Sequence, residues 1–299
     1  MAAFPRNATV AINPLQYFAT PEGYLDWDQA PPWPELMAEL KSAGFDAVHT
    51  RFPAGFAPRD YGQIIRDAGL TPAPGTIQFD IPEDGVSIEE TVEHFRRNAV
   101  GYAELGMDHI FILPAVREDA LRLITPAVGA HADNARLDSV VRVLEAACRA
   151  SVDEGVLPIL HQHVGAWVET AEETRYVMDR VDPEILGFGP DNGHMSWAGV
   201  DPIELITEYR DRVRGVHLKD FRQNVIDESR ARGRTYQETV LAGLWTEPGQ
   251  GDFNFDRLWD ALGADFAGTI VIEVDRGTIE PPFESVRACA EWANNLRAA

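Results

Sequence analysis

Histidine and carboxylate side chains follow four successive apolar segments in the second half of the chain. His161 comes after Leu-Pro-Ile-Leu, Asp191 after Gly-Phe-Gly-Pro, His217 after Gly-Val, and Glu273 after Ile-Val-Ile. Imidazole and carboxylate groups together suit a divalent ion, Mn²⁺ or Co²⁺ first, with Zn²⁺ or Mg²⁺ as alternatives. Open positions on such an ion could hold hydroxyl or carbonyl oxygens of a small molecule. These residues are therefore candidate metal ligands. The alternative is that each one only hydrogen-bonds a neighbouring loop.

Two histidines stand two residues apart in the first of these segments. His161 and His163 flank Gln162, and residues i and i+2 of a β-strand point to the same side. The apolar residues before them predict that both imidazoles face the interior of the fold. The spacing leaves open which of the two would bind the ion.

Two cations follow His217 closely. Lys219 and Arg222 could complement negative charge on substrate oxygens or on a developing enolate. The alternative is that both are ordinary surface charges. Asp220, which lies between them, could orient a ligand or simply close a loop, and the sequence does not separate these roles.

Several further residues carry weaker signals. Trp33, Trp197 and Trp245 could stack on a sugar ring, although tryptophan more often packs in a core or at its rim. Glu169 and Glu247 are expected to be solvated charges at a helix cap or in a loop. The Gly-Gln-Gly-Asp sequence at 249–252 predicts a tight turn.

Short β-rich runs alternate with amphipathic helical stretches along the chain. This alternation predicts parallel strands joined by right-handed helical crossovers. Eight such units in 299 residues favour a closed (β/α)₈ TIM barrel of the α/β class over an open doubly wound sheet. The predicted strands are residues 8–14, 45–52, 70–79, 108–115, 157–163, 185–191, 214–220 and 268–275, and the predicted helices are residues 34–45, 61–70, 87–107, 137–156, 170–181, 201–213, 255–266 and 281–297.

The pattern predicts a single catalytic domain over residues 1–299, because no linker-like or low-complexity stretch divides it. One irregular stretch, at about 221–252, is expected to be a loop insertion after the seventh strand. Helix starts at Ser87 and Thr170 are each followed three residues later by glutamate, which predicts capping boxes. In a barrel the active site forms at the carboxyl ends of the strands, which is where the candidate ligands stand.

Net charge and cysteine content limit which partners and which cellular compartment we expect. The chain has 26 Lys+Arg against 48 Asp+Glu, a formal charge of −22 that makes nucleic acid and anionic membrane surfaces poor partners. Neither Cys148 nor Cys289 belongs to a paired-cysteine motif, and no long apolar segment or leader pattern is evident. We therefore expect a cytoplasmic enzyme with a small-molecule partner. The sequence does not determine whether the protein forms homo-oligomers.

Five segments carry a resemblance to a known family. They are residues 12–14 (Ile-Asn-Pro), 161–165 (His-Gln-His-Val-Gly), 191–194 (Asp-Asn-Gly-His), 217–222 (His-Leu-Lys-Asp-Phe-Arg) and 242–252 (Ala-Gly-Leu-Trp-Thr-Glu-Pro-Gly-Gln-Gly-Asp). Over nearly its whole length the chain resembles the xylose-isomerase-like superfamily of metal-dependent TIM barrels. That superfamily includes sugar isomerases, ketose 3-epimerases, nucleases and dehydratases, and the chain is most similar to its inosose-dehydratase-like branch.

The resemblance implies roles for particular residues. It implies Asp191, His217 and Glu273 as metal ligands, with His161 at the position where the superfamily usually supplies a glutamate. The fourth ligand stays open between His161 and His163. The resemblance also implies that His194 contacts substrate.

The resulting expectation is a metal-dependent enzyme that acts on a sugar or cyclitol ketone through an enediolate. Lys219, Arg222 and His194 would complement its charge, and either His163 or a ligand carboxylate such as Glu273 would be the base. Asn13, Trp197 and Trp245 are further candidates for substrate contact. Loss of water would make the enzyme a dehydratase.

Other functions remain as alternatives. Return of the proton would make the enzyme a ketose isomerase or 3-epimerase, and the same chemistry could eliminate from a 3-keto-glycoside. A non-catalytic sugar-binding barrel belongs to a different class of function, and the net charge disfavours a nuclease.

Overall fold

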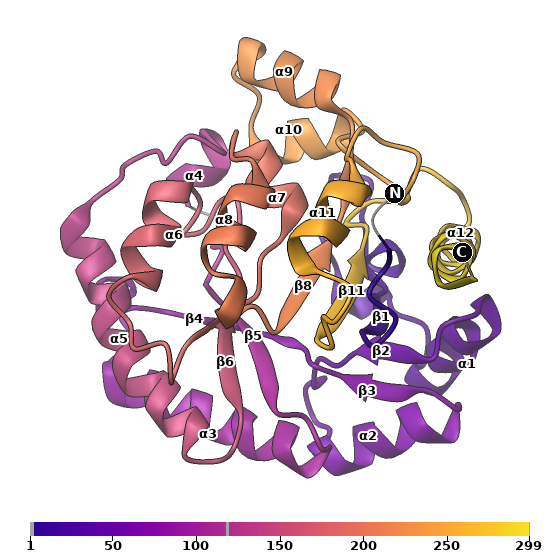
Figure 1. Ribbon diagram of the computed structural model, residues 1–299, viewed down its shortest axis with the longest axis horizontal. Coiled ribbons are helices and arrows are strands. Elements are labelled where there is room, and N and C mark those ends of the chain that lie inside the picture. Colours follow the sequence, from indigo (N-terminus) through magenta and orange to yellow (C-terminus); the bar gives the residue numbers. More distant parts are fainter. Residues whose placement is uncertain (1–2, 118–119, 299) are drawn as a thin grey trace. The chain divides into compact units, whose positions relative to one another are not determined.

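Parallel strands alternate with helices in the computed structural model, which describes residues 3–117 and 120–298 (Figure 1). The residue contacts divide into two compact units. The first unit comprises residues 1–49, 62–73 and 216–299, and the second comprises residues 50–61 and 74–215. Each unit has its own parallel sheet.

The first unit contains a five-stranded sheet in the order β3-β2-β1-β11-β8. Asn13, the last residue of β1, pairs with Glu273, the last residue of β11, so two polar side chains leave the sheet at the same level. Helices α1 and α12 pack against each other. The strands are β1 (Thr9–Asn13), β2 (Ala47–His49), β3 (Thr71–Ala73), β8 (Gly215–Leu218) and β11 (Thr269–Glu273), and the helices are α1 (Trp33–Ala43), α11 (Phe255–Leu262) and α12 (Pro282–Ala298).

The second unit contains a four-stranded sheet in the order β4-β5-β6-β7. Helices α3 and α5 pack side by side (Figure 1), and β5 is buried along its whole length, as expected for a parallel strand covered on both faces. The strands are β4 (Thr76–Phe79), β5 (His109–Pro114), β6 (Leu157–Leu160) and β7 (Gly187–Phe188). The helices are α3 (Ile88–Glu104), α4 (Leu121–Ile124), α5 (Asn134–Val152), α6 (Ala171–Met178), α7 (Asn192–Trp197) and α8 (Pro202–Glu208).

Helix α2 (Pro58–Asp67) spans the boundary between the ranges of the two units, and four short 3₁₀ helices occupy connections. The 3₁₀ helices are η1 (Leu15–Tyr17), η2 (Trp27–Gln29), η3 (Pro82–Asp84) and η4 (Arg210–Arg212). None of the helices in residues 3–117 and 120–298 is long and apolar enough to cross a membrane.

Both predicted capping boxes are confirmed. At the start of α3 the Ser87 hydroxyl accepts from Glu90 N (3.2 Å), and the Glu90 carboxylate accepts from Ser87 N (2.9 Å). Thr170 and Glu173 make the equivalent pair of bonds at α6. These bonds satisfy amide groups that the first turn of a helix leaves without partners.

The predicted third strand is two strands, β3 and β4, separated by Pro74 and Gly75. Proline has no N–H for the ladder, and the chain passes so close to the second strand that a Cβ on Gly75 would lie 1.7 Å from the carbonyl oxygen of Thr50. Only glycine permits this approach, so the break depends on the contact with Thr50 as well as on Pro74.

The segment predicted as a loop insertion contains regular structure. It holds α9 (Gln223–Arg232), α10 (Tyr236–Leu241) and an antiparallel pair, β9 (Asp220–Phe221) with β10 (Trp245–Thr246). The sequence of α9 is mostly polar and lacks the apolar stripe that identifies a helix from sequence.

Candidate metal centre

Glu273 is the centre of a buried polar cluster in the first unit. Its Oε2 accepts from Asn13 Nδ2 (2.5 Å) and lies 3.0 Å from His217 Nδ1, and its Oε1 lies 2.5 Å from Lys219 Nζ. Burial by itself would raise the pKa of Glu273, but the charge of Lys219 and the contacts with His217 bring that pKa well below its usual value. Glu273 is therefore a carboxylate and available to a cation.

Lys219 is 1% exposed and lies among charged and aromatic partners. Besides Glu273, its Nζ lies 3.0 Å from Asp275 Oδ1 and 5.3 Å from the ring centre of Trp245. A buried ammonium needs opposite charge nearby, and a tryptophan face adds a cation–π attraction. The Lys219 side chain is thus held in the interior, which removes the alternative of a surface charge.

His49 is a member of this cluster that the sequence reasoning missed. It ends β2, is buried, and its ring centre lies 5.5 Å from that of His217 in an edge-to-face arrangement. Its position at the carboxyl end of a strand was the available signal, because strand ends in barrels carry functional residues.

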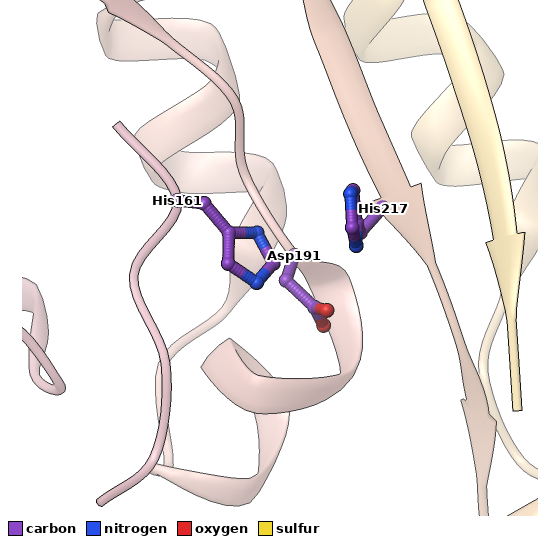
Figure 2. Close-up of side chains that lie close together, drawn as sticks. All are labelled: His161, Asp191 and His217. Carbon is purple, nitrogen blue, oxygen red and sulfur yellow. The ribbon is translucent and has the colours of Figure 1, made fainter. Parts of the chain in front are cut away.

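His161 and Asp191 lie together in the second unit, and both are buried. Asp191 caps α7, with Oδ1 accepting from His194 N (2.8 Å), and its backbone is fixed by two hydrogen bonds with Gln162. The ligand atoms of His161 and Asp191 lie within 4.8 Å of each other. Figure 2 shows these two side chains and that of His217 from the first unit.

Two further imidazoles lie next to this pair. The ring centres of His163 and His194 are 3.7 Å apart with a 39° angle between the planes, and the ring centre of Trp197 lies 6.3 Å from that of His194. His163 Nδ1 lies 2.7 Å from the carbonyl oxygen of Val164. A carbonyl only accepts, so Nδ1 carries a proton and a neutral His163 has its lone pair on Nε2.

The loop after β6 is tied down by a buried carboxylate. Glu169 accepts from the backbone N–H groups of Gly165 (2.8 Å), Val128 (2.8 Å) and Gly129 (2.9 Å), and burial raises its pKa. The prediction of a solvated charge at Glu169 is wrong, because its partners are amides that the local sequence does not show. These bonds fix the loop that carries His163.

Asp220 is a second buried carboxylate, and its contacts distinguish between orienting a ligand and closing a loop. Its two oxygens accept from the backbone N–H groups of Phe221 (2.9 Å), Gly249 (2.8 Å), Gly251 (2.9 Å) and Phe253 (3.1 Å), and burial raises its pKa against the effect of these bonds. Asp220 therefore closes a loop within the protein. A Cβ on Gly251 would lie 2.3 Å from Asp220 Oδ1, so glycine is required there.

Glu247 is also buried, and the prediction of a solvated loop charge is wrong for it too. It accepts from Thr278 N (2.9 Å), Ile279 N (3.1 Å) and the Ser285 hydroxyl (2.6 Å). Burial would raise its pKa, but these bonds leave it below the usual value. A tight turn lies at 247–250, two residues before the predicted 249–252, with Gln250 N bonded to Glu247 O (3.1 Å) and Gly249 at φ +85°.

The family described as "Xylose isomerase-like TIM barrel" matches residues 37–296, which is most of the chain. The chain belongs to this family. The predicted TIM-barrel fold and the resemblance drawn from the five segments are thereby confirmed.

Curated relatives of this xylose isomerase-like barrel are named enzymes. The inosose dehydratase of Geobacillus kaustophilus is 28% identical over 218 residues, which is 71% of this chain and 71% of that protein. The inosose dehydratase of Lactiplantibacillus plantarum is 37% identical over 123 residues, 41% of each chain. This second match spans less than half the length of the relative.

Solved structures share the fold of this xylose isomerase-like barrel. The probable 3-DHS dehydratase AsbF from Bacillus anthracis has a TM-score of 0.68 at 12% identity, over 96% of this chain and 99% of that one. The IOLI protein with a bound zinc atom has a TM-score of 0.65 at 15% identity, over 97% and 98% of the two chains. At these identities the likeness concerns the fold.

Each unit offers donors of a type that suits a divalent ion. His161, Asp191 and His217 are buried, and each offers one ligand atom. Two donors that each lie about 2.1 Å from one ion are about 3 Å apart when they occupy adjacent positions, and His217 Nδ1 and Glu273 Oε2 are separated by 3.0 Å. The donor set is the mixed imidazole and carboxylate type expected from the sequence.

The other residues predicted to contact substrate make contacts within the protein. Arg222 is half-buried and its Nη1 donates to Gly243 O (3.0 Å). Trp197 and Trp245 are buried, as the packing alternative expects, and Trp33 is half-buried with its ring centre 6.3 Å from that of Phe18.

Proposed function

We propose that this chain is a divalent-metal-dependent dehydratase that removes water from a polyhydroxylated cyclic ketone of the inosose type. His161, Asp191, His217 and Glu273 would hold the ion, with Mn²⁺ or Co²⁺ as the first candidates. The observation that carries the proposal is the cluster around Glu273, where a buried carboxylate, a buried ammonium and an imidazole meet at strand ends. The names of the curated relatives support the substrate class.

When bound, the ion held by these residues would supply a Lewis acid for substrate oxygens, which would acidify the α-proton on the hydroxyl-bearing carbon next to the ketone. Negative charge that develops on the oxygen needs positive partners in a site from which water is excluded. Lys219 supplies such a charge, because its ammonium is fixed in the interior by Glu273, Asp275 and Trp245.

His163 and His194 would move the protons. His163 holds its Nδ1 proton on Val164 O, so its Nε2 can accept the proton from the α-carbon. The electrons of that C–H bond form the enediolate. Its collapse expels the β-hydroxyl, which takes a proton from His194 and leaves as water. The contact between the two rings lets the acid and the base act on one substrate.

Among the residues predicted to contact substrate, some would act through a neighbouring side chain and others could touch the substrate. Asn13 and Trp245 would act through Glu273 and Lys219, which they contact. Arg222 keeps guanidinium donors beyond the one on Gly243 O, and these could hold a substrate hydroxyl. Trp197 would flank the ring of His194.

Proton NMR in D₂O tests the proposal. Metal-loaded protein is mixed with scyllo-inosose and, separately, with a panel of ketohexoses. We expect loss of water from inosose, with deuterium uptake at the α-carbon. A new ketose or aldose without loss of water would instead establish an isomerase or epimerase, and binding without exchange or turnover would indicate a sugar-binding barrel.

A further inference from the structure

Two carboxylates share one buried ammonium in the first unit. Lys219 Nζ lies 2.5 Å from Glu273 Oε1 and 3.0 Å from Asp275 Oδ1. The Lys219 side chain is 1% exposed and that of Asp275 is 12% exposed, so water screens this group of charges weakly. Glu273 and Asp275 therefore both compensate the positive charge of Lys219.

In the proposed function the single carboxylate of Glu273 would have to bind two cations at once. The proposed function requires its Oε2, beside His217 Nδ1, to bind a divalent ion, while its Oε1 holds Lys219. A dication and an ammonium on one carboxylate repel each other strongly in a buried site. With Glu273 alone, binding of the ion would favour release of Lys219, and Lys219 would compete with the ion.

Lys219 has little freedom to move away. Its Nζ lies 5.3 Å from the ring centre of Trp245. Trp245 is fixed on β10, whose partner strand β9 begins at Asp220, the residue after Lys219. The conflict on Glu273 is therefore relieved by added negative charge beside Lys219 and not by withdrawal of the lysine.

We propose that Asp275 is a positioning residue that serves as the standing counter-ion of Lys219 and so allows Glu273 to bind the divalent ion with Lys219 in place. This inference rests on the proposed function, because it requires an ion at Glu273. It assigns to Asp275 an effect on metal affinity that operates entirely through Lys219.

A double-mutant cycle tests the inference by isothermal titration of metal-free protein with Mn²⁺ and with Zn²⁺. Asp275→Asn should raise the Kd about 10- to 100-fold, as substitutions around metal ligands do. In a Lys219→Met background the same substitution should change the Kd less than about 3-fold, because the charge that Asp275 balances is gone. Asp275→Glu, which keeps the charge, should stay within about 3-fold of the parent protein.

The outcomes separate this inference from the proposed function. Equal weakening by Asp275→Asn in both backgrounds would mean that Asp275 binds the ion directly or acts through folding, and would overturn the inference alone. An unchanged Kd in Asp275→Asn, or an equal loss in Asp275→Glu, would overturn it as well. Absence of binding by the parent protein would overturn the proposed function and the inference together. Thermal unfolding of each metal-free variant checks that it is folded.

Discussion

The imidazole rings of His163 and His194 lie with their centres 3.7 Å apart and their planes tilted by 39°, although 31 positions separate the two residues in sequence. His163 is carried by the loop after β6 and His194 by α7, whose cap is Asp191. The cap therefore fixes a proposed proton-transfer residue and a proposed metal ligand in one local structure. A change in either loop would alter the alignment of the two rings.

Replacement of His163 by asparagine should reduce kcat by about 10²–10⁴-fold, the usual contribution of a positioned general base. The Kd for Mn²⁺ should change less than about 3-fold if His161 is the ligand from this loop. NMR turnover assays and metal titration measure the two quantities. A large loss of metal affinity with residual turnover would exchange the roles of His161 and His163.

His94→Asn is the matched control for the His163 variant. His94 lies on α3 in the same unit and its Nε2 contacts Gln78 O (3.1 Å), outside the proposed site. Its replacement should leave kcat within about 2-fold of the parent value. A fall in kcat comparable to that of His163→Asn would show that loss of any histidine disturbs this unit.

Asp191→Asn should separate the capping role of Asp191 from its role as a ligand. Asparagine caps helices about as well as aspartate, so the free energy of unfolding of metal-free protein should fall by less than about 1 kcal/mol. Metal affinity should fall by at least about 100-fold, beyond the range seen for residues around the ligands. Chelator should then lower the Tm of the parent protein but not that of the variant.

The control for Asp191→Asn is Asp201→Asn, which changes the cap of α8, where Asp201 Oδ1 accepts from Ile203 N (3.1 Å). It should retain both metal binding and turnover. Full metal affinity in Asp191→Asn would contradict the proposed ligand set.

Asp220→Asn should destabilise the protein by about 2–4 kcal/mol. The new amide group would face backbone N–H groups that now bond to a carboxylate oxygen, and each buried donor left without an acceptor costs about 1–3 kcal/mol. Urea unfolding measures the effect. The control is Asp252→Asn, because the exposed Asp252 carboxylate accepts a single bond from Gln223 N (2.8 Å), and this change should cost less than about 1 kcal/mol. Equal losses of stability in the two variants would contradict the loop-closing role assigned to Asp220.

Glu247 should make stability depend on acid pH. Its pKa in the folded protein lies below the value of about 4.5 expected for the unfolded chain. The stabilisation is therefore complete above pH of about 4.5 and is lost as pH falls through the folded pKa. Urea unfolding at several pH values from 7 downward should show that the difference between parent protein and Glu247→Gln shrinks below pH of about 4.5. A difference that stays constant would show that Glu247 does not titrate in this way.

The alternation of strands and helices could be predicted from the sequence because each element has its own periodicity. The all-buried strand β11 and the capping boxes of α3 and α6 are local patterns of this kind. Helix α9 was not predicted because its residues are mostly polar and show no apolar stripe. The division of the third strand depends on the passage of Gly75 beside Thr50, which is a contact between residues far apart in the sequence.

The sequence by itself determined which side chains are present for chemistry, since imidazoles, carboxylates and Lys219 follow the ends of successive strands, and this pattern predicts metal and enolate chemistry on a barrel. Only the tertiary structure decided which charges are buried and what each one touches. Glu169 and Glu247 were predicted to be solvated and the role of Asp220 was open, because the partners of all three are backbone N–H groups of loops distant in sequence. Only the folded structure places His49 beside His217 and Asp275 beside Lys219. Burial is a property of the packed chain, and no local pattern records it.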